Sequence, residues 1–154
     1  MPNDCLNVIE CLRHDDPATL QRLVEGLQRD PPVFLAAFVP CPDHSHPVQH
    51  WGTKWDVYDV VLDAVTETTV QMSFHTAWRP PLEAYAALKA QGFTIDAMFM
   101  EGGCDFCGYW RDGDTVTFDN VSHDLDHVPE DFHFYFVDDH REEEEEEEVE
   151  VEED

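Results

Sequence analysis

Apolar residues follow a strand pattern and then a helix pattern in the first part of the chain. Residues 6–12 form the first candidate strand. Asp16 and Pro17 are a typical N-cap and first residue of a helix, which the Asp30-Pro31-Pro32 sequence ends. The apolar residues of this helix recur at positions i, i+3, i+4 and i+7, namely Leu20, Leu23, Val24 and Leu27. The pattern therefore predicts a strand followed by an amphipathic helix.

A hairpin, a second helix and another strand are predicted next. Residues 40–50 are rich in proline and histidine, which indicates an irregular loop. Residues 58–64 and 69–76 alternate in polarity, which predicts two paired strands. Pro80-Pro81 begins a helix with Leu82, Tyr85 and Leu88 facing inward, and Gly92 ends it. Residues 93–99 again alternate and predict a strand.

The last predicted elements are a hairpin and an acidic extension. Asp112-Gly113 between residues 106–111 and 114–118 is a strong hairpin signal. Phe132, Phe134 and Phe136 alternate with other residues, which indicates one more strand. We expect an α+β protein with a ferredoxin-like split β-α-β-β-α-β antiparallel sheet, an added C-terminal hairpin and an acidic tail. Its predicted parts are a domain at 1–118, an extension at 119–137 and a polyglutamate tail at 138–154, disordered when free.

The acidic charge of the chain is the feature that indicates most about its possible partners. Its 154 residues include 35 acidic and eight basic residues, for a net charge of −27. Residues 1–111 carry a net charge of −8, whereas residues 112–154 carry −19 with Arg141 as their one base. Such a charge disfavours direct binding to nucleic acid or to an anionic membrane. A partner with a basic face is expected instead.

The cysteines and the N-terminal segment indicate a cytoplasmic protein. The first ten residues lack the basic and apolar regions of a signal peptide. The longest apolar run is residues 33–39, far shorter than the roughly 20 residues that cross a bilayer. Five cysteines, an odd number, are expected to be reduced thiols.

Four blocks of sequence give the chain a family resemblance. They are the opening Met1, Pro2, Asn3, Cys5 and Asn7; WGTKWD at 51–56; F-x-TAW-x-PP at 74–81; and GGCDFCG at 102–108. In this order they resemble the YubB ferredoxin-like domain of phage and plasmid proteins, over roughly residues 1–118. The resemblance implies a ferredoxin-like fold and an origin in a mobile element, most naturally a phage. Cys104 and residues 119–154 depart from the family pattern.

A few cysteine and histidine residues suggest one alternative for the function of the chain, a zinc-stabilised interaction module. Cys41 and His44 lie in the predicted loop, and Cys104 and Cys107 form a C-x-x-C pair, so four zinc ligands are available. The spacing is looser than that of a zinc signature, and small buried thiols are the favoured explanation of the cysteines. The primary expectation is therefore that no cofactor is bound.

Motifs of enzymes are missing from the sequence. It has no G-x-S-x-G, P-loop or dinucleotide fingerprint, and among 35 acids any catalytic pair would be arbitrary. Lys54 and Trp55 are expected to belong to a loop over the sheet edge with packed indole rings. We therefore expect a protein without enzymatic activity.

The acidic residues carry the functional hypothesis. An acidic chain has a charge every ~3.3 Å when extended and every ~1.5 Å when helical, close to the spacing of phosphates along one strand and along a duplex. The sequence thus predicts a phage-encoded mimic of DNA or RNA charge that inhibits a host defence complex, CRISPR or restriction, at its nucleic-acid-binding face. A phage accessory or structural protein without an inhibitory role is a further alternative. The expected partner-binding residues are Asp112, Asp114, Asp119, Asp124, Asp126, Glu130, Asp131, Asp138, Asp139, Glu142, Glu143, Glu144, Glu145, Glu146, Glu147 and Glu148.

Overall fold

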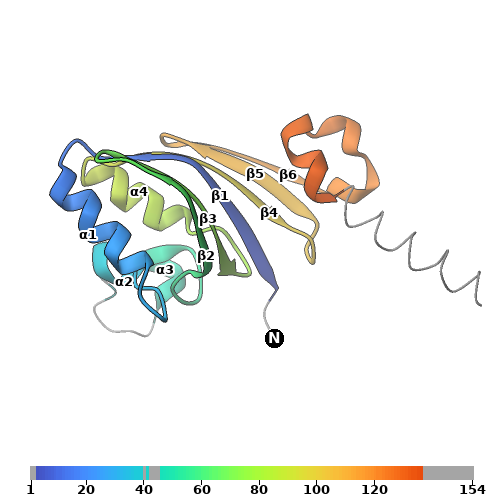
Figure 1. Cartoon of the computed structure of the whole chain (residues 1–154). Coiled ribbons are helices and arrows are strands. Elements are labelled where there is room, and N and C mark those ends of the chain that lie inside the picture. The colour runs from blue at the N-terminus through green and yellow to red at the C-terminus, as the bar shows by residue number, and fades with distance from the viewer. Residues whose placement is uncertain (1–2, 40, 42–45, 137–154) are drawn as a thin grey trace, which may run out of the picture.

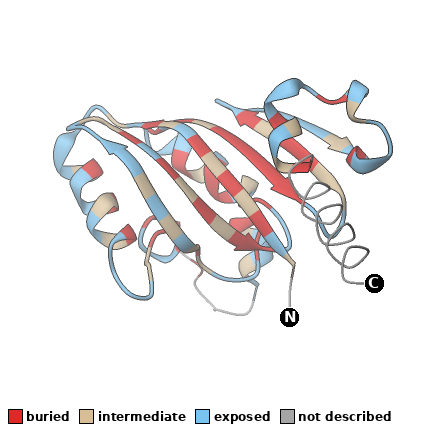
Figure 2. Cartoon of the chain, turned by 45° about the vertical axis from the view of Figure 1, so that its right-hand side comes forward, coloured by how far each residue is buried: buried red, intermediate tan, exposed pale blue. Residues whose placement is uncertain are grey.

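Within the described residues, six strands form one open antiparallel sheet in the order β2-β3-β1-β4-β5-β6. The computed structural model describes residues 3–39, 41 and 46–136. The strands are β1 (Asp4–Arg13), β2 (Tyr58–Val65), β3 (Thr69–Ala77), β4 (Thr94–Glu101), β5 (Phe106–Arg111) and β6 (Asp114–Asp119). Figure 2 shows the buried positions concentrated on the inner strands. The predicted α+β class and the predicted strands up to residue 118 are confirmed.

In the part of the chain that the structure describes, four α-helices between β1 and β4 gather on one side of this sheet (Figure 1). They are α1 (Pro17–Leu27), α2 (Leu35–Phe38), α3 (Pro47–Trp51) and α4 (Leu82–Ala90). The Asp16 carboxylate caps α1 by accepting hydrogen bonds from the Ala18 amide at 3.2 Å and the Thr19 hydroxyl at 2.8 Å. These hydrogen bonds stabilise the charged form, so they lower the pKa of Asp16. The cap begins α1 where the sequence predicts it.

The main core lies between these helices and the sheet. It includes Leu23 of α1 and Leu88 of α4, which are fully buried against Met72 and Phe74 of β3 and against Ile95 of β4. The alternation in β3 and the helical spacing in α1 thus point their apolar residues into the same layer, as the sequence pattern requires.

Helix α3 lies inside the stretch that the sequence predicts as an irregular loop. Pro47 is in the first turn, and Gly52 ends the helix with a left-handed φ of 84°. Proline fits the first turn of a helix and glycine fits its left-handed end, so a five-residue helix forms here despite the proline content. The prediction of a loop is therefore wrong for residues 47–50, and the helix continues for one residue beyond the predicted loop.

The predicted strand at residues 132–136 is also wrong. After β6 the chain forms three 3-10 turns, η1 (Val121–His123), η2 (Leu125–His127) and η3 (Glu130–Phe132), and residues 133–136 are helical. Phe132 and Phe136 are buried, whereas Phe134 is 52% exposed. The buried pair is separated by four residues, so the segment follows a helical period and the alternation of phenylalanines is coincidental.

This segment builds a second, smaller core on the sheet. Its buried residues Val121, Val128, Phe132 and Phe136 pack in one cluster with Met98, Met100 and Cys107. Strands β4 and β5 contribute side chains to this cluster from two cross-strand pairs, Met98 with Tyr109 and Met100 with Cys107. The predicted extension at 119–137 therefore packs on the sheet up to residue 136, and residues 137–154 lie outside the described residues.

Two phenylalanine variants test this arrangement. We expect Phe132→Ala to lower the free energy of unfolding by about 3–5 kcal/mol, since it removes a buried ring from the second core. Phe134→Ala should change it by less than about 0.5 kcal/mol, because that ring is half exposed. Urea unfolding of both variants measures the difference. Equal effects would indicate a strand in which the two rings share one face.

Candidate functional site

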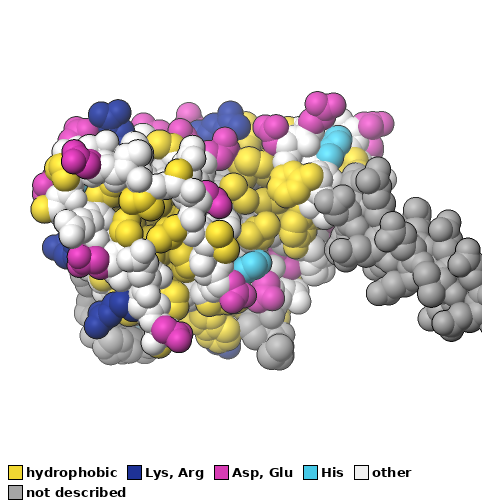
Figure 3. All heavy atoms as spheres, viewed as in Figure 1, with side chains coloured by type: hydrophobic (Ala, Val, Ile, Leu, Met, Phe, Trp, Pro, Cys, Tyr) yellow, Lys and Arg dark blue, Asp and Glu magenta, His cyan; other side chains and the backbone are white. Residues whose placement is uncertain are grey.

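The segment after β5 presents an acidic face. Seven carboxylates predicted to bind a partner are exposed in the structure, and Figure 3 shows acidic side chains along the top of the segment after β6. These are Asp112, Asp114, Asp119, Asp124, Asp126, Glu130 and Asp131. We call them the acidic face. Asp124, Asp126, Glu130 and Asp131 stand on backbone that the second core holds against the sheet, whereas Asp112, Asp114 and Asp119 belong to the β5–β6 hairpin. All seven carboxylates are therefore positioned by folded structure.

Few groups neutralise the acidic face. In the described part of the chain, its one ion pair with a lysine or arginine joins Lys89 Nζ to Asp112 Oδ1 at 3.8 Å. Asp124 accepts a hydrogen bond of 3.0 Å from the Asp126 amide, which caps η2. Residues 112–136 contain no lysine or arginine. Six of the seven carboxylates therefore keep their charge available to a partner.

The remaining predicted partner-binding residues belong to the tail. Asp138, Asp139 and the glutamates at 142–148 lie outside the described residues. The acidic face ends at Asp131 and the acidic residues of the tail begin at Asp138, so the two sets of carboxylates follow one another along the chain.

The candidate zinc ligands do not come together in the structure. Cys41 lies in the main core, Cys107 lies in the second core, and Cys104 is exposed in the turn between β4 and β5. His44 lies outside the described residues. Among the residues that the structure describes, no group of three histidine, cysteine or acidic side chains is arranged to hold a metal ion.

The cysteines of the C-x-x-C pair have environments that keep their thiols protonated. Burial raises the pKa of Cys107 to about 12, as it does for Cys5 of β1. The buried carboxylate of Glu101 accepts hydrogen bonds of 2.7 Å from the Gly103 and Cys104 amides, and its interaction with the Cys104 thiol raises the pKa of that thiol. Because nucleophilic cysteines need a lowered pKa, these residues behave as structural thiols.

Most of the WGTKWD block has a structural role. The Trp51 indole donates to the Val39 carbonyl at 2.7 Å, and the Thr53 hydroxyl donates to the Ala77 carbonyl at 2.8 Å. Asp56 accepts from the Leu35 amide at 2.9 Å and also from the amides of residues 34, 36 and 57. The prediction of packed indoles is correct for Trp51, but Trp55 is 41% exposed.

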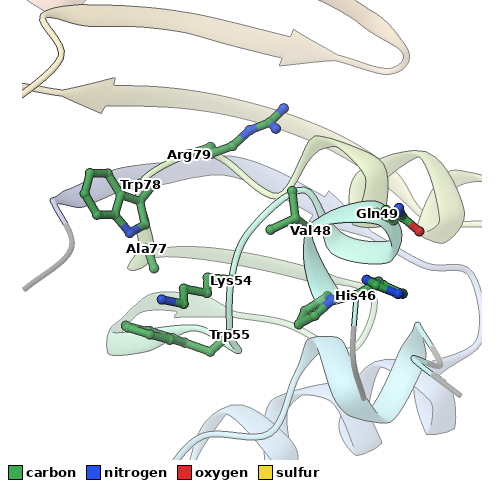
Figure 4. A pocket seen from close by; sticks show the side chains of 9 residues that line it. His46, Val48, Gln49, Lys54, Trp55, Ala77, Trp78 and Arg79 are labelled. Atoms are coloured by element: carbon green, nitrogen blue, oxygen red, sulfur yellow. The ribbon is translucent and has the colours of Figure 1, made fainter. Parts of the chain in front are cut away.

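The sequence also did not predict the exposure of a second tryptophan, Trp78, which directly follows β3. It is 44% exposed, and it has a left-handed φ of 71°, which bulky residues rarely adopt. Its amide donates to the Asn3 carbonyl at 2.8 Å, which continues the pairing of β1 with β3 by one residue. Trp55 and Trp78 line one cleft of about 680 Å³ (Figure 4). Only the three-dimensional fold shows this proximity, since 22 positions separate the two residues.

Comparison with family models, curated proteins and solved structures finds no match to this chain. The resemblance of residues 1–118 to the YubB domain therefore stays a prediction. Among the described residues, no helix has both the length and the apolar character needed to span a membrane.

Thiol labelling tests the cysteine environments. At pH 8 we expect Cys104 to react with an aromatic disulfide reagent in the native protein because it is exposed, although more slowly than an ordinary exposed cysteine because its pKa is raised. Cys5 and Cys107 should react only after unfolding. The native pKa of about 12 for both buried thiols lies above the ordinary 9.0, so their contribution to stability is present below pH 9 and is lost as the pH approaches 12. Prompt labelling of Cys107 in the native protein would contradict this placement.

Proposed function

We propose that this protein occupies the nucleic-acid-binding face of a basic partner protein and blocks it by mimicking the charge of DNA or RNA. The observation that carries this proposal is the acidic face: seven exposed carboxylates on a folded support, of which only Asp112 pairs with a lysine or arginine in the described structure. A basic cleft that releases counterions on binding phosphates would release them in the same way on binding these carboxylates.

The support under the acidic face matters because charge interactions have a short range. At physiological salt the Debye length is about 8 Å, so only carboxylates that enter the partner's cleft contribute to binding. A folded segment pays little conformational entropy when it docks, whereas a flexible acidic chain must be ordered. The acidic face thus serves as the anchor, and the run of glutamates at 142–148 that follows it in the sequence adds charge of phosphate-like density.

The proposed target is a host defence complex of the restriction or CRISPR type. One argument for this target is the ferredoxin-like fold that we propose for residues 1–118. In the sheet, β2, β3, β1 and β4 lie side by side in that order, and α1 and α4 lie in the connections on one side. Together with the four YubB-like blocks, this fold favours a phage or plasmid origin. Mobile elements encounter defence complexes that act on nucleic acid, and such complexes have basic clefts.

A matched pair of triple variants tests the role of the acidic face. One variant carries Asp126→Asn, Glu130→Gln and Asp131→Asn; the control carries Glu10→Gln, Asp63→Asn and Glu67→Gln, which are exposed acids outside the acidic face. Both lose three negative charges. The partner is first captured from host lysate with the intact protein as bait. In a competition assay between the protein and DNA for this captured partner, we expect the first variant to lose at least tenfold in affinity. Its slope of log K against log salt should fall by up to about three.

This comparison shows whether binding depends on where the carboxylates lie or only on the net charge of the protein. Equal losses in both triple variants would mean that net charge alone matters, and no loss in either would exclude the acidic face as the binding surface. The same proteins expressed in bacteria should protect an incoming phage from restriction or CRISPR targeting, with the acidic-face variant impaired and the control active. A chain ending at Val137 measures the contribution of the tail in both assays.

A further inference from the structure

The cleft between Trp55 and Trp78 differs in composition from the rest of the surface. The nine residues that line it are His46, Pro47, Val48, Gln49, Lys54, Trp55, Ala77, Trp78 and Arg79. None of them is acidic, although the chain has 35 acidic residues. Its volume of about 680 Å³ is within the range of small-molecule sites, which are typically apolar with a few polar groups.

The residues around Trp55 explain why its indole faces this cleft. Trp51, Thr53 and Asp56 are fixed by buried or part-buried hydrogen bonds. Gly52 has a left-handed φ of 84°, which strains other residues, and a Cβ there would lie 3.0 Å from the Leu82 backbone nitrogen. Lys54 and Trp55 are the two residues of the block that remain exposed. The loop therefore has a rigid base that projects these two side chains.

Trp78 is held in a similar way from the other side of the cleft. Phe74 and Ala77 before it are buried, and Pro80 and Pro81 after it are buried. The Thr76 hydroxyl donates to the Arg79 carbonyl at 2.7 Å, which closes the backbone around Trp78. The other non-glycine residues with positive φ in the described chain are aspartate or asparagine, which tolerate this conformation. Strain at an exposed bulky residue is typical of ligand-binding sites.

Lys54 provides the charge in the cleft. Its ammonium lies 5.4 Å from the centre of the Trp55 ring, and Figure 4 shows Trp78 on the other side of it. Arg79, the second cation, is 3.9 Å from Glu83 Oε1 and is partly neutralised by it. Lys54 is thus the cation that a ligand can engage, between two indole rings that offer stacking surfaces.

We propose that this cleft binds a small anion with a flat ring, whose ring stacks on Trp55 or Trp78 and whose phosphate or carboxylate contacts Lys54. Stacking on an aromatic side chain tolerates any flat ring, and the ammonium selects ligands that carry negative charge. The net charge of −27 repels anions at long range, but at physiological salt a screening length of about 8 Å leaves the local contact with Lys54 decisive. This site is separate from the acidic face, so either proposal can fail alone.

The indole N–H signals of the four tryptophans provide a test by ¹H–¹⁵N NMR of the full chain. The probes are adenosine 5′-monophosphate, adenosine without the anion, ribose 5-phosphate without the ring, and indole-3-acetate as the carboxylate counterpart. We expect the nucleotide or the acetate to shift the signals of Trp55 and Trp78 and to leave those of the buried Trp51 and Trp110 in place. Adenosine and ribose 5-phosphate should bind at least about tenfold more weakly.

Three variants complete the test. Lys54→Met, which keeps an unbranched side chain, should weaken binding of the charged probe at least about tenfold, and Arg29→Gln removes a positive charge at an exposed position outside the cleft and should leave binding unchanged. Trp78→Asn keeps a residue that accepts positive φ, so the fold is retained while stacking is lost. The proposal is overturned if neither charged probe saturates the Trp55 and Trp78 signals, if adenosine binds as tightly as its phosphate, or if Lys54→Met binds normally.

Discussion

The packing of residues 121–136 on the sheet is the interaction on which the acidic face depends. This segment is strongly acidic, and it would not stay folded if its apolar side chains had no surface to pack on. These side chains are Val121, Val128, Phe132 and Phe136. Met98, Met100 and Cys107 supply that surface. Burial of these side chains offsets the repulsion among the neighbouring carboxylates and fixes them in one place.

In this chain of 154 residues, the sheet keeps the main core, the second core and the cleft apart. One side holds the main core beneath α1 and α4, and the other side holds the second core beneath residues 121–136, which carry four of the seven carboxylates of the acidic face. The loop before β2 and the turn after β3 form a cleft that has the opposite electrostatic character. Because the acidic face and the cleft rest on different elements, exposed side chains of one can be substituted without touching the other, and the proposed functions can be examined one at a time.

The sequence predicts those features that depend on local periodicity. The helix at Asp16, the hairpin at Asp112-Gly113 and the strands from β1 to β6 are readable because capping, turn chemistry and alternation act over a few residues. Phe132, Phe134 and Phe136 fit a strand as well as a helix, and only contact with Met98 and Met100 selects the helical period. The cleft could not be predicted, since Trp55 and Trp78 meet through the fold, and the exposure of an indole is decided by its neighbours.

A structure of the protein bound to its captured partner tests the central claim most directly. We predict that Asp126, Glu130 and Asp131 will lie within 4 Å of lysine or arginine side chains in the cleft where the partner binds nucleic acid, a distance roughly that of a direct ion pair. A complex in which these carboxylates face solvent, with the partner held by uncharged contacts elsewhere on the sheet, would contradict the account.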